Sequence, residues 1–147
     1  MNDDPVNRLS PSEFEETEVI TRWLDFDLAG HVTDAMYPLY FSDSRGEFLA
    51  ARVGSFEEFP CVLMRIEIDY KREIRYPART LLLRTRIDNV GRSSVSFEQQ
   101  LVRPDGVIAA VARAVLVSFD TERRESIPIS DAYRARLLGP PTNDRQA

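Results

Sequence analysis

The chain has 147 residues, 43% of them hydrophobic and 29% charged, with a formal net charge of −5. This length fits one domain that buries its own hydrophobic core without disulfide or metal support. One cysteine, Cys61, and one histidine, His31, exclude a disulfide framework and a site built on several cysteines or histidines, so no metal site is expected. The net negative charge argues against a nucleic-acid partner.

The N-terminal region is acidic and has neither the basic start nor the apolar run of a secretory signal. The longest apolar run, residues 107–112, is far shorter than the roughly 18 residues of a membrane span. We therefore expect a soluble cytoplasmic protein without a membrane partner. The folded domain is predicted over residues 13–139, because residues 1–12 and 140–147 have the polar, proline-containing composition of flexible tails.

The first predicted element is a strand over residues 14–23, and the loop over residues 24–32 follows it. A helix is predicted over residues 34–52, because aromatic side chains recur there at helical spacing and form a stripe that can pack on a sheet. Asp34 is expected to cap the N-terminus of this helix, and Gly54 to end it.

From residue 62 the apolar period changes to two, which indicates strands. The first of them is expected to place one set of alternating side chains on a single face: Val62, Met64, Ile66, Ile68 and Tyr70. Further strands are predicted over residues 80–88, 94–102 and 107–119, with turns at 89–91 and 104–106. A short helix over residues 131–138, capped by Ser130, ends the domain.

Short connections between consecutive strands indicate antiparallel neighbours. One long helix together with a curved antiparallel sheet is an α+β architecture. We expect the sheet to wrap around the helix, because the strand over residues 107–119 has a face of small side chains, Ala110, Ala112 and Ala114.

Few residues in this chain can perform covalent or acid–base chemistry, since it has no nucleophile elbow, glycine-rich phosphate loop or Cys/His pair at motif spacing. The exceptions are Asp25 and Asp27, which precede the predicted start of the long helix. Unpaired N–H groups at a helix start can stabilise an oxyanion, and a carboxylate beside them can act as nucleophile or general base. One carboxylate and one N–H group suffice to hydrolyse a thioester, because a thiolate leaves without an acid.

A structural interpretation stays open for each of these residues. Either aspartate can simply cap the turn, and a lone loop histidine such as His31 is often a structural hydrogen-bonding residue. The turn Arg92-Ser93-Ser94 offers guanidinium, hydroxyl and N–H groups to a phosphate, but it is equally an ordinary polar turn.

Two stretches carry a family resemblance when they are taken together. Residues 22–32 read RWLDFDLAGHV, and the helix that follows presents Tyr37, Tyr40 and Phe41. They resemble the opening of hotdog-fold acyl-CoA thioesterases, in particular the 4-hydroxybenzoyl-CoA thioesterase-like family. The resemblance implies a hotdog fold, in which an antiparallel sheet of five or six strands wraps around one long central helix. It also implies a homodimer, or a dimer of dimers, with sites at the dimer interface.

The same resemblance assigns roles to individual residues. Asp27 falls on the catalytic carboxylate, and the backbone N–H of Asp34 on the oxyanion donor. The expected substrate-binding residues are Tyr37 and Phe41 in the acyl pocket and Arg92, Ser93 and Ser94 at the phosphates of coenzyme A (CoA). His31 is also expected to bind the substrate. No cofactor is expected, because CoA is part of the substrate.

The expected activity is therefore hydrolysis of an acyl-CoA to a free acid and CoA. A non-catalytic protein that binds acyl-CoA needs the same pocket and stays an alternative. A hydratase is disfavoured, because the resemblance requires Asp and His five residues apart, whereas Asp27 and Asp25 precede His31 by four and six.

Overall fold

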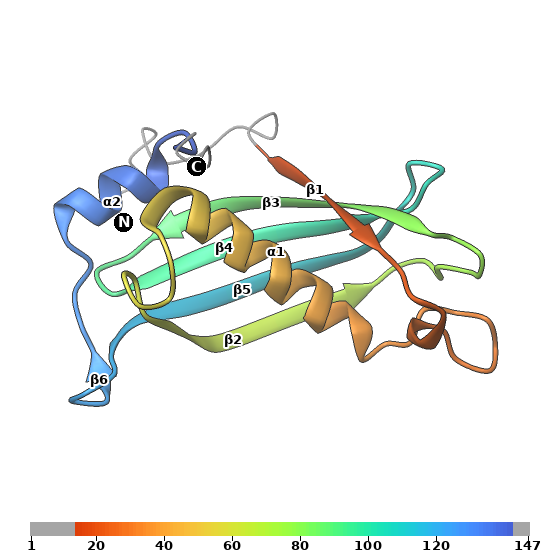
Figure 1. The fold of residues 1–147 in the computed structure, drawn as a ribbon, viewed down its shortest axis with the longest axis horizontal. Coiled ribbons are helices and arrows are strands. Elements are labelled where there is room, and N and C mark those ends of the chain that lie inside the picture. The colour runs from red at the N-terminus through yellow and green to blue at the C-terminus, as the bar shows by residue number, and fades with distance from the viewer. Residues whose placement is uncertain (1–13, 143–147) are drawn as a thin grey trace.

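The structure, a computed structural model, describes residues 14–142. Its strands are β1 (Glu15–Ile20), β2 (Cys61–Tyr70), β3 (Thr80–Val90), β4 (Ser94–Val102), β5 (Ile108–Asp120) and β6 (Glu125–Ser126). Its helices are the 3-10 helix η3 (Trp23–Asp25), α1 (Met36–Val53) and α2 (Asp131–Leu138). The strands pair antiparallel in the order β1-β3-β4-β5-β2, and β6 pairs with β5. Figure 1 shows α1 lying along one face of this sheet, which confirms the predicted α+β hotdog architecture.

The core lies between α1 and the sheet. The aromatic stripe of α1 is buried as predicted, with Tyr37, Phe41 and Phe48 between 0% and 4% exposed. Ala110, Ala112 and Ala114 of β5 are also buried, and side chains this small let the helix approach the sheet closely. The buried strand positions also include polar residues, among them Gln99, which is completely buried and whose partners are described below.

The start of α1 differs from the prediction, whereas its end agrees with it. The helix begins at Met36 with Ala35 at the N-cap position, and no side chain caps it, so the prediction that Asp34 caps the helix is wrong. Pro38 lies in the first turn, where a missing N–H costs no helical hydrogen bond. Gly54 ends the helix with a φ of 87°, a conformation that favours glycine.

Strand β2 contains a bulge that the alternating pattern conceals. Its register against β5 shifts between Leu63 and Arg65, which leaves Met64 as the extra residue. Leu63 therefore lies opposite the buried Leu116, while Met64 is 69% exposed. The prediction that Val62 and Met64 share a face with Ile66 is wrong, because one extra residue exchanges the two faces.

The C-terminal part of the described chain packs against α1. Helix α2 has the predicted bounds, and the Ser130 hydroxyl caps it by accepting a hydrogen bond from the Tyr133 N–H. Thr142 donates two hydrogen bonds to the carbonyl of Ala51. Of the predicted tails, residues 1–12 and 143–147 lie outside the described residues. None of the helices described here has the length and apolar character needed to cross a membrane.

Candidate functional site

The two aspartates that precede α1 have different environments. Asp25 is 1% exposed, and its carboxylate accepts hydrogen bonds from the backbone N–H and the side chain of Arg22 and from the Tyr40 hydroxyl, the last at 2.8 Å. Burial by itself raises the pKa of Asp25, but these hydrogen bonds and the Arg22 charge outweigh burial and lower it. Asp25 therefore anchors the loop to α1, and both of its carboxylate oxygens are occupied by protein donors.

Asp27 is exposed and is held by the hairpin that it belongs to. Its Oδ1 accepts hydrogen bonds from the N–H groups of Ala29 and His31, at 2.9 and 3.1 Å. The Asp27 N–H donates to the His31 carbonyl, and Gly30 turns the chain with a φ of 77°. Within residues 14–142, Oδ2 of Asp27 receives no hydrogen bond, so one carboxylate oxygen is fixed in place and the other is available.

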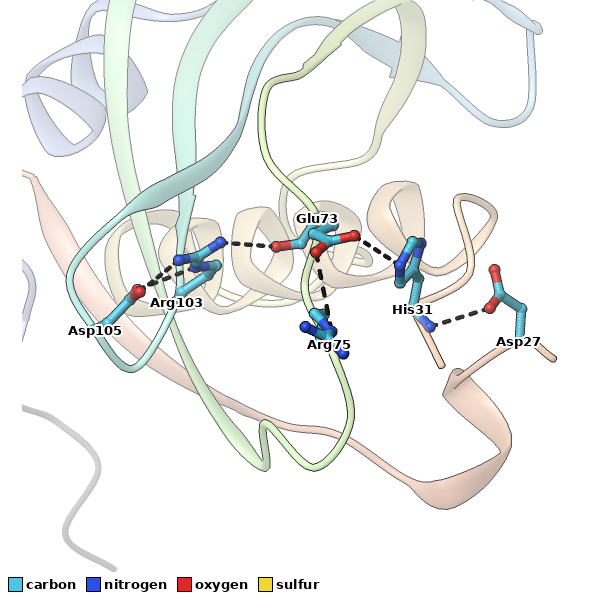
Figure 2. A network of polar contacts seen from close by, with 6 residues as sticks. All are labelled: Asp27, His31, Glu73, Arg75, Arg103 and Asp105. Atoms are coloured by element: carbon cyan, nitrogen blue, oxygen red, sulfur yellow. Dashed lines mark hydrogen bonds and ion pairs between the residues drawn. The ribbon is translucent and has the colours of Figure 1, made fainter. Parts of the chain in front are cut away.

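The His31 side chain joins this hairpin to the segment that follows β2 (Figure 2). Its Nε2 lies 2.7 Å from the Glu73 carboxylate, and its backbone forms a bridge with Arg75. Arg103 extends the network by donating a hydrogen bond to the Glu73 carbonyl while it pairs with Asp105. The hydrogen bond from the Arg103 side chain to the Asp105 carboxylate lowers the pKa of Asp105 to about 2. The histidine thus connects Asp27 to a network that reaches the β4–β5 turn.

The backbone at the start of α1 offers unpaired donors. The N–H groups of Met36 and Tyr37 donate to the carbonyls of Thr33 and Asp34. Within the described part of the chain, the N–H groups of Asp34 and Ala35 donate to no protein group. Such groups at a helix N-terminus can hold an oxyanion. The predicted donor, Asp34 N–H, is therefore free in this structure.

A cleft of 230 Å³ joins the helix start to the end of β2. Its lining includes three predicted site residues, His31, Asp34 and Tyr37. The strand side contributes residues that sequence reasoning did not assign to the site: Tyr70, Lys71, Arg72 and Glu73. The sequence did place these residues at the end of the clearest predicted strand. Only the fold shows that this strand, β2, ends beside the start of α1.

The two predicted acyl-pocket residues are placed differently. Tyr37 lines the cleft and packs edge-on against Tyr70, with ring centres 4.8 Å apart. Burial raises the pKa of the Tyr37 hydroxyl. Phe41 is 0% exposed and packs in the core with residues such as Ile74 and Leu101. In one chain, Tyr37 can therefore contact a ligand in the cleft, whereas Phe41 supports the helix from behind.

The Arg92-Ser93-Ser94 turn lies at the other end of the sheet from the Asp27 hairpin (Figure 1). Its backbone holds neighbouring segments, since the carbonyls of Arg92 and Ser93 accept hydrogen bonds from Ile129 and Ser118. Arg92 is exposed. One chain does not bring this turn to the cleft, so contact with the same ligand requires a second chain.

The described residues contain no cluster of three or more His, Cys, Asp or Glu side chains that could hold a metal ion. What the site offers is an available carboxylate oxygen, unpaired N–H groups and a cleft bordered by two basic residues. These elements match the needs of acyl transfer from a thioester.

Comparisons with known proteins agree with this chemistry. Residues 21–137 match the sequence profile of the thioesterase-like superfamily. A predicted thioesterase from Bacillus stearothermophilus is 26% identical, with a TM-score of 0.78 over 84% of this chain and 93% of that one. A thioesterase from Thermus thermophilus, complexed with coenzyme A and Zn, is 26% identical, with a TM-score of 0.77 over 86% of this chain and 98% of that one.

A DHNA-CoA thioesterase from Staphylococcus aureus shares the fold at 17% identity, with a TM-score of 0.72 over 78% of this chain and 80% of that one. No curated protein matches the sequence. The profile match and the structural neighbours confirm the expected fold and enzyme class, a thioester hydrolase: the chain belongs to the thioesterase-like superfamily.

Proposed function

We propose that the protein hydrolyses an acyl-CoA thioester with Asp27 as its catalytic carboxylate. One observation carries the proposal: Asp27 is held by two N–H groups on one oxygen and keeps the other oxygen available, beside a helix start with unpaired donors. Asp25, the other candidate, is buried and fully engaged with Arg22 and Tyr40.

In this reaction the thioester carbonyl oxygen accepts hydrogen bonds from the N–H groups of Asp34 and Ala35. Oδ2 of Asp27 either attacks the carbonyl carbon or removes a proton from the attacking water. The carbon–sulfur bond then breaks, and CoA leaves as a thiolate. Attack by Asp27 gives an anhydride that a water molecule hydrolyses, so both routes yield a carboxylic acid and CoA.

The charged rim of the cleft supports CoA as the thiol. Lys71 and Arg72 are exposed beside the helix start, where they can meet phosphate groups. The Arg92 turn stays a candidate for the same phosphates if a second chain supplies it. The neighbour from Thermus thermophilus, complexed with coenzyme A and Zn, is consistent with this ligand class.

The free edge of β2 supports a homodimer as part of the proposal. This strand ends the sheet, and its exposed side chains include Leu63 and Met64, at 49% and 69%. A long apolar edge is a template for pairing with another strand. Two copies paired antiparallel through β2 keep their helices on the same side of one continuous sheet, and the Cys61 end of one strand then lies beside the Tyr70 end of the other.

The test is the release of free thiol from a panel of aliphatic and aromatic acyl-CoAs by the wild type and by Asp27→Asn. We expect turnover in the wild type and a loss of about 100-fold or more in the variant, the value of a positioned acid–base or nucleophilic group. Asp43→Asn, which alters an exposed aspartate of α1, serves as the control and retains wild-type turnover. Wild-type binding of acyl-CoA without turnover would instead support the non-catalytic alternative.

A further inference from the structure

Two buried arginines on α1 differ in how their charges are balanced. Arg52 is 6% exposed and meets the Glu15 carboxylate at 2.8 Å, and its guanidinium also stacks on the Phe48 ring. Arg45 is 5% exposed, yet within residues 14–142 no carboxylate lies within 4.0 Å of its guanidinium. A buried cation without a counter-ion is costly, which makes Arg45 the exception to be explained.

Arg45 has one hydrogen-bond partner in the described chain. Its Nη1 donates to the Gln99 Oε1 at 2.9 Å. The Gln99 amide nitrogen donates in turn to the Phe41 carbonyl and the Thr85 hydroxyl, so both ends of this buried amide are fixed. A guanidinium has five N–H donors. Gln99 therefore orients Arg45 from the sheet side with one of them and leaves four for another partner.

Arg45 borders a pocket of 350 Å³ between α1, the segment after it and β2. The rest of the lining is mainly apolar and includes Leu49, Phe56, Phe59, Leu63 and Leu116. No acidic residue of the described chain belongs to the lining. The pocket is of the size that small ligands occupy, and it combines apolar walls with one oriented cation.

We propose that this pocket binds a carboxylate carried on an apolar chain or ring, with the carboxylate on Arg45 and the apolar body against Leu49, Phe59 and Leu116. A carboxylate supplies the negative charge that Arg45 lacks and accepts its free N–H groups in forked geometry. The apolar walls select against a small inorganic anion.

The position of the pocket relates it to the proposed reaction. Arg45 lies nine positions after Met36, which is about 13.5 Å along the helix, so the pocket is distant from the cleft at the helix start of its own chain. Antiparallel pairing through β2 places the pocket, at the Cys61 end, beside the cleft of the second copy. The bound carboxylate can then come from either of two sources. One is the distal end of a dicarboxylic acyl group, and this source rests on the proposed function. The other is a free monocarboxylic acid such as the reaction product.

The chain's single cysteine makes the pocket directly observable, because Cys61 belongs to its lining. The first experiment measures the rate of Cys61 alkylation by iodoacetamide, and octanoate binding by calorimetry, in the intact protein. We expect octanoate to bind and to slow alkylation about fivefold or more at saturation. Octanamide has the same apolar chain without the charge, and we expect it to bind at least tenfold more weakly, the value of a charge-assisted hydrogen bond.

Arg45→Gln removes the cation, and we expect this variant to bind octanoate no better than octanamide. The comparison of the two ligands on the wild type decides the proposal even if the variant does not fold. Equal binding of octanoate and octanamide, or no binding of octanoate, overturns it.

The second experiment identifies the source of the carboxylate by comparing the hydrolysis of suberyl-CoA and octanoyl-CoA. A preference of about tenfold for suberyl-CoA that disappears in Arg45→Gln assigns the pocket to the distal carboxylate of the substrate. Equal kcat/KM values, with competitive inhibition by octanoate, assign it to the free acid. If neither thioester is hydrolysed, the wider acyl-CoA panel decides the proposed function, while the alkylation and calorimetry results still decide whether the pocket binds carboxylates.

Discussion

Replacing Tyr40 with phenylalanine tests whether Asp25 anchors the loop that carries Asp27. The Tyr40 hydroxyl donates to Oδ2 of Asp25 at 2.8 Å, and both side chains are buried, at 6% and 1% exposed. A hydrogen bond to a charged acceptor contributes about 1.5–3 kcal/mol to stability. With an m-value of about 2 kcal/mol/M, typical of a small domain in urea, the unfolding midpoint should fall by about 1 M.

The pH dependence gives the same prediction a second measurement. The pKa of Asp25 is lowered in the folded protein, so its carboxylate contributes stability above the unfolded-state pKa of about 3.9, and this contribution is lost as the pH falls through the folded-state pKa. Tyr40→Phe removes one of the hydrogen bonds that lower this pKa. The difference in unfolding free energy between wild type and variant should therefore be largest near pH 7 and narrow below about pH 4.

Tyr37→Phe is the matched control, because Tyr37 is a buried tyrosine of the same helix whose hydroxyl has no hydrogen-bond partner within residues 14–142. We expect this variant to change stability by less than about 0.5 kcal/mol. Equal urea midpoints for the two variants, or a Tyr40→Phe effect that does not narrow as the pH falls below 4, would refute the role assigned to Asp25.

Three further predictions concern other parts of the molecule. Gly54→Ala should destabilise the protein by about 1–3 kcal/mol in urea unfolding, because Gly54 has a φ of 87°. Gly46→Ala, in the exposed middle of α1, should stabilise the protein by about 0.5–1 kcal/mol. Changes of the same sign in both variants would contradict the conformational argument. Arg103→Gln should raise the pKa of Asp105 from about 2 toward its usual value in an NMR titration of the carboxyl group, since the Arg103 contact is the main cause of the shift. Arg92→Ala should raise KM for acyl-CoA more than it lowers kcat, as expected when uniform binding is lost, and an unchanged KM would remove Arg92 from the binding site.

The elements of this fold were predictable because their patterns are local. Apolar alternation located β3, β4 and β5, and the Ser130 cap located α2 at its observed bounds. The bulge at Met64 was not predictable, since β2 has apolar side chains on both sides of it, and alternation reads the same with or without an extra residue. The start of α1 was misplaced because Asp34 is a favourable N-cap residue that here makes no cap.

The candidate site could be predicted only in part, for a physical reason. Asp27, His31 and Asp34 belong to one hairpin and helix start, so a motif contains them. Glu73 and Lys71 reach the same cleft through the pairing of β2 with β5, which sets where β2 ends. The structure was also needed to show which of the two aspartates is available. The hydroxyl of Tyr40, 15 residues further along the chain, donates a hydrogen bond to Asp25 and so occupies that carboxylate.

The bulge at Met64 makes β2 a strand of two independent segments. A shift of one residue that paired Met64 with Leu116 would restore strict alternation and present Val62 and Met64, in place of Cys61 and Leu63, to the wall beside Arg45, while Ile66, Ile68 and Tyr70 kept their places. Such a shift would exchange the side chains that the first part of β2 contributes to this pocket and leave the cleft at the helix start unaltered. The register of the segment that begins at Cys61 can therefore set which side chains face the pocket, while the hairpin that holds Asp27 stays unchanged.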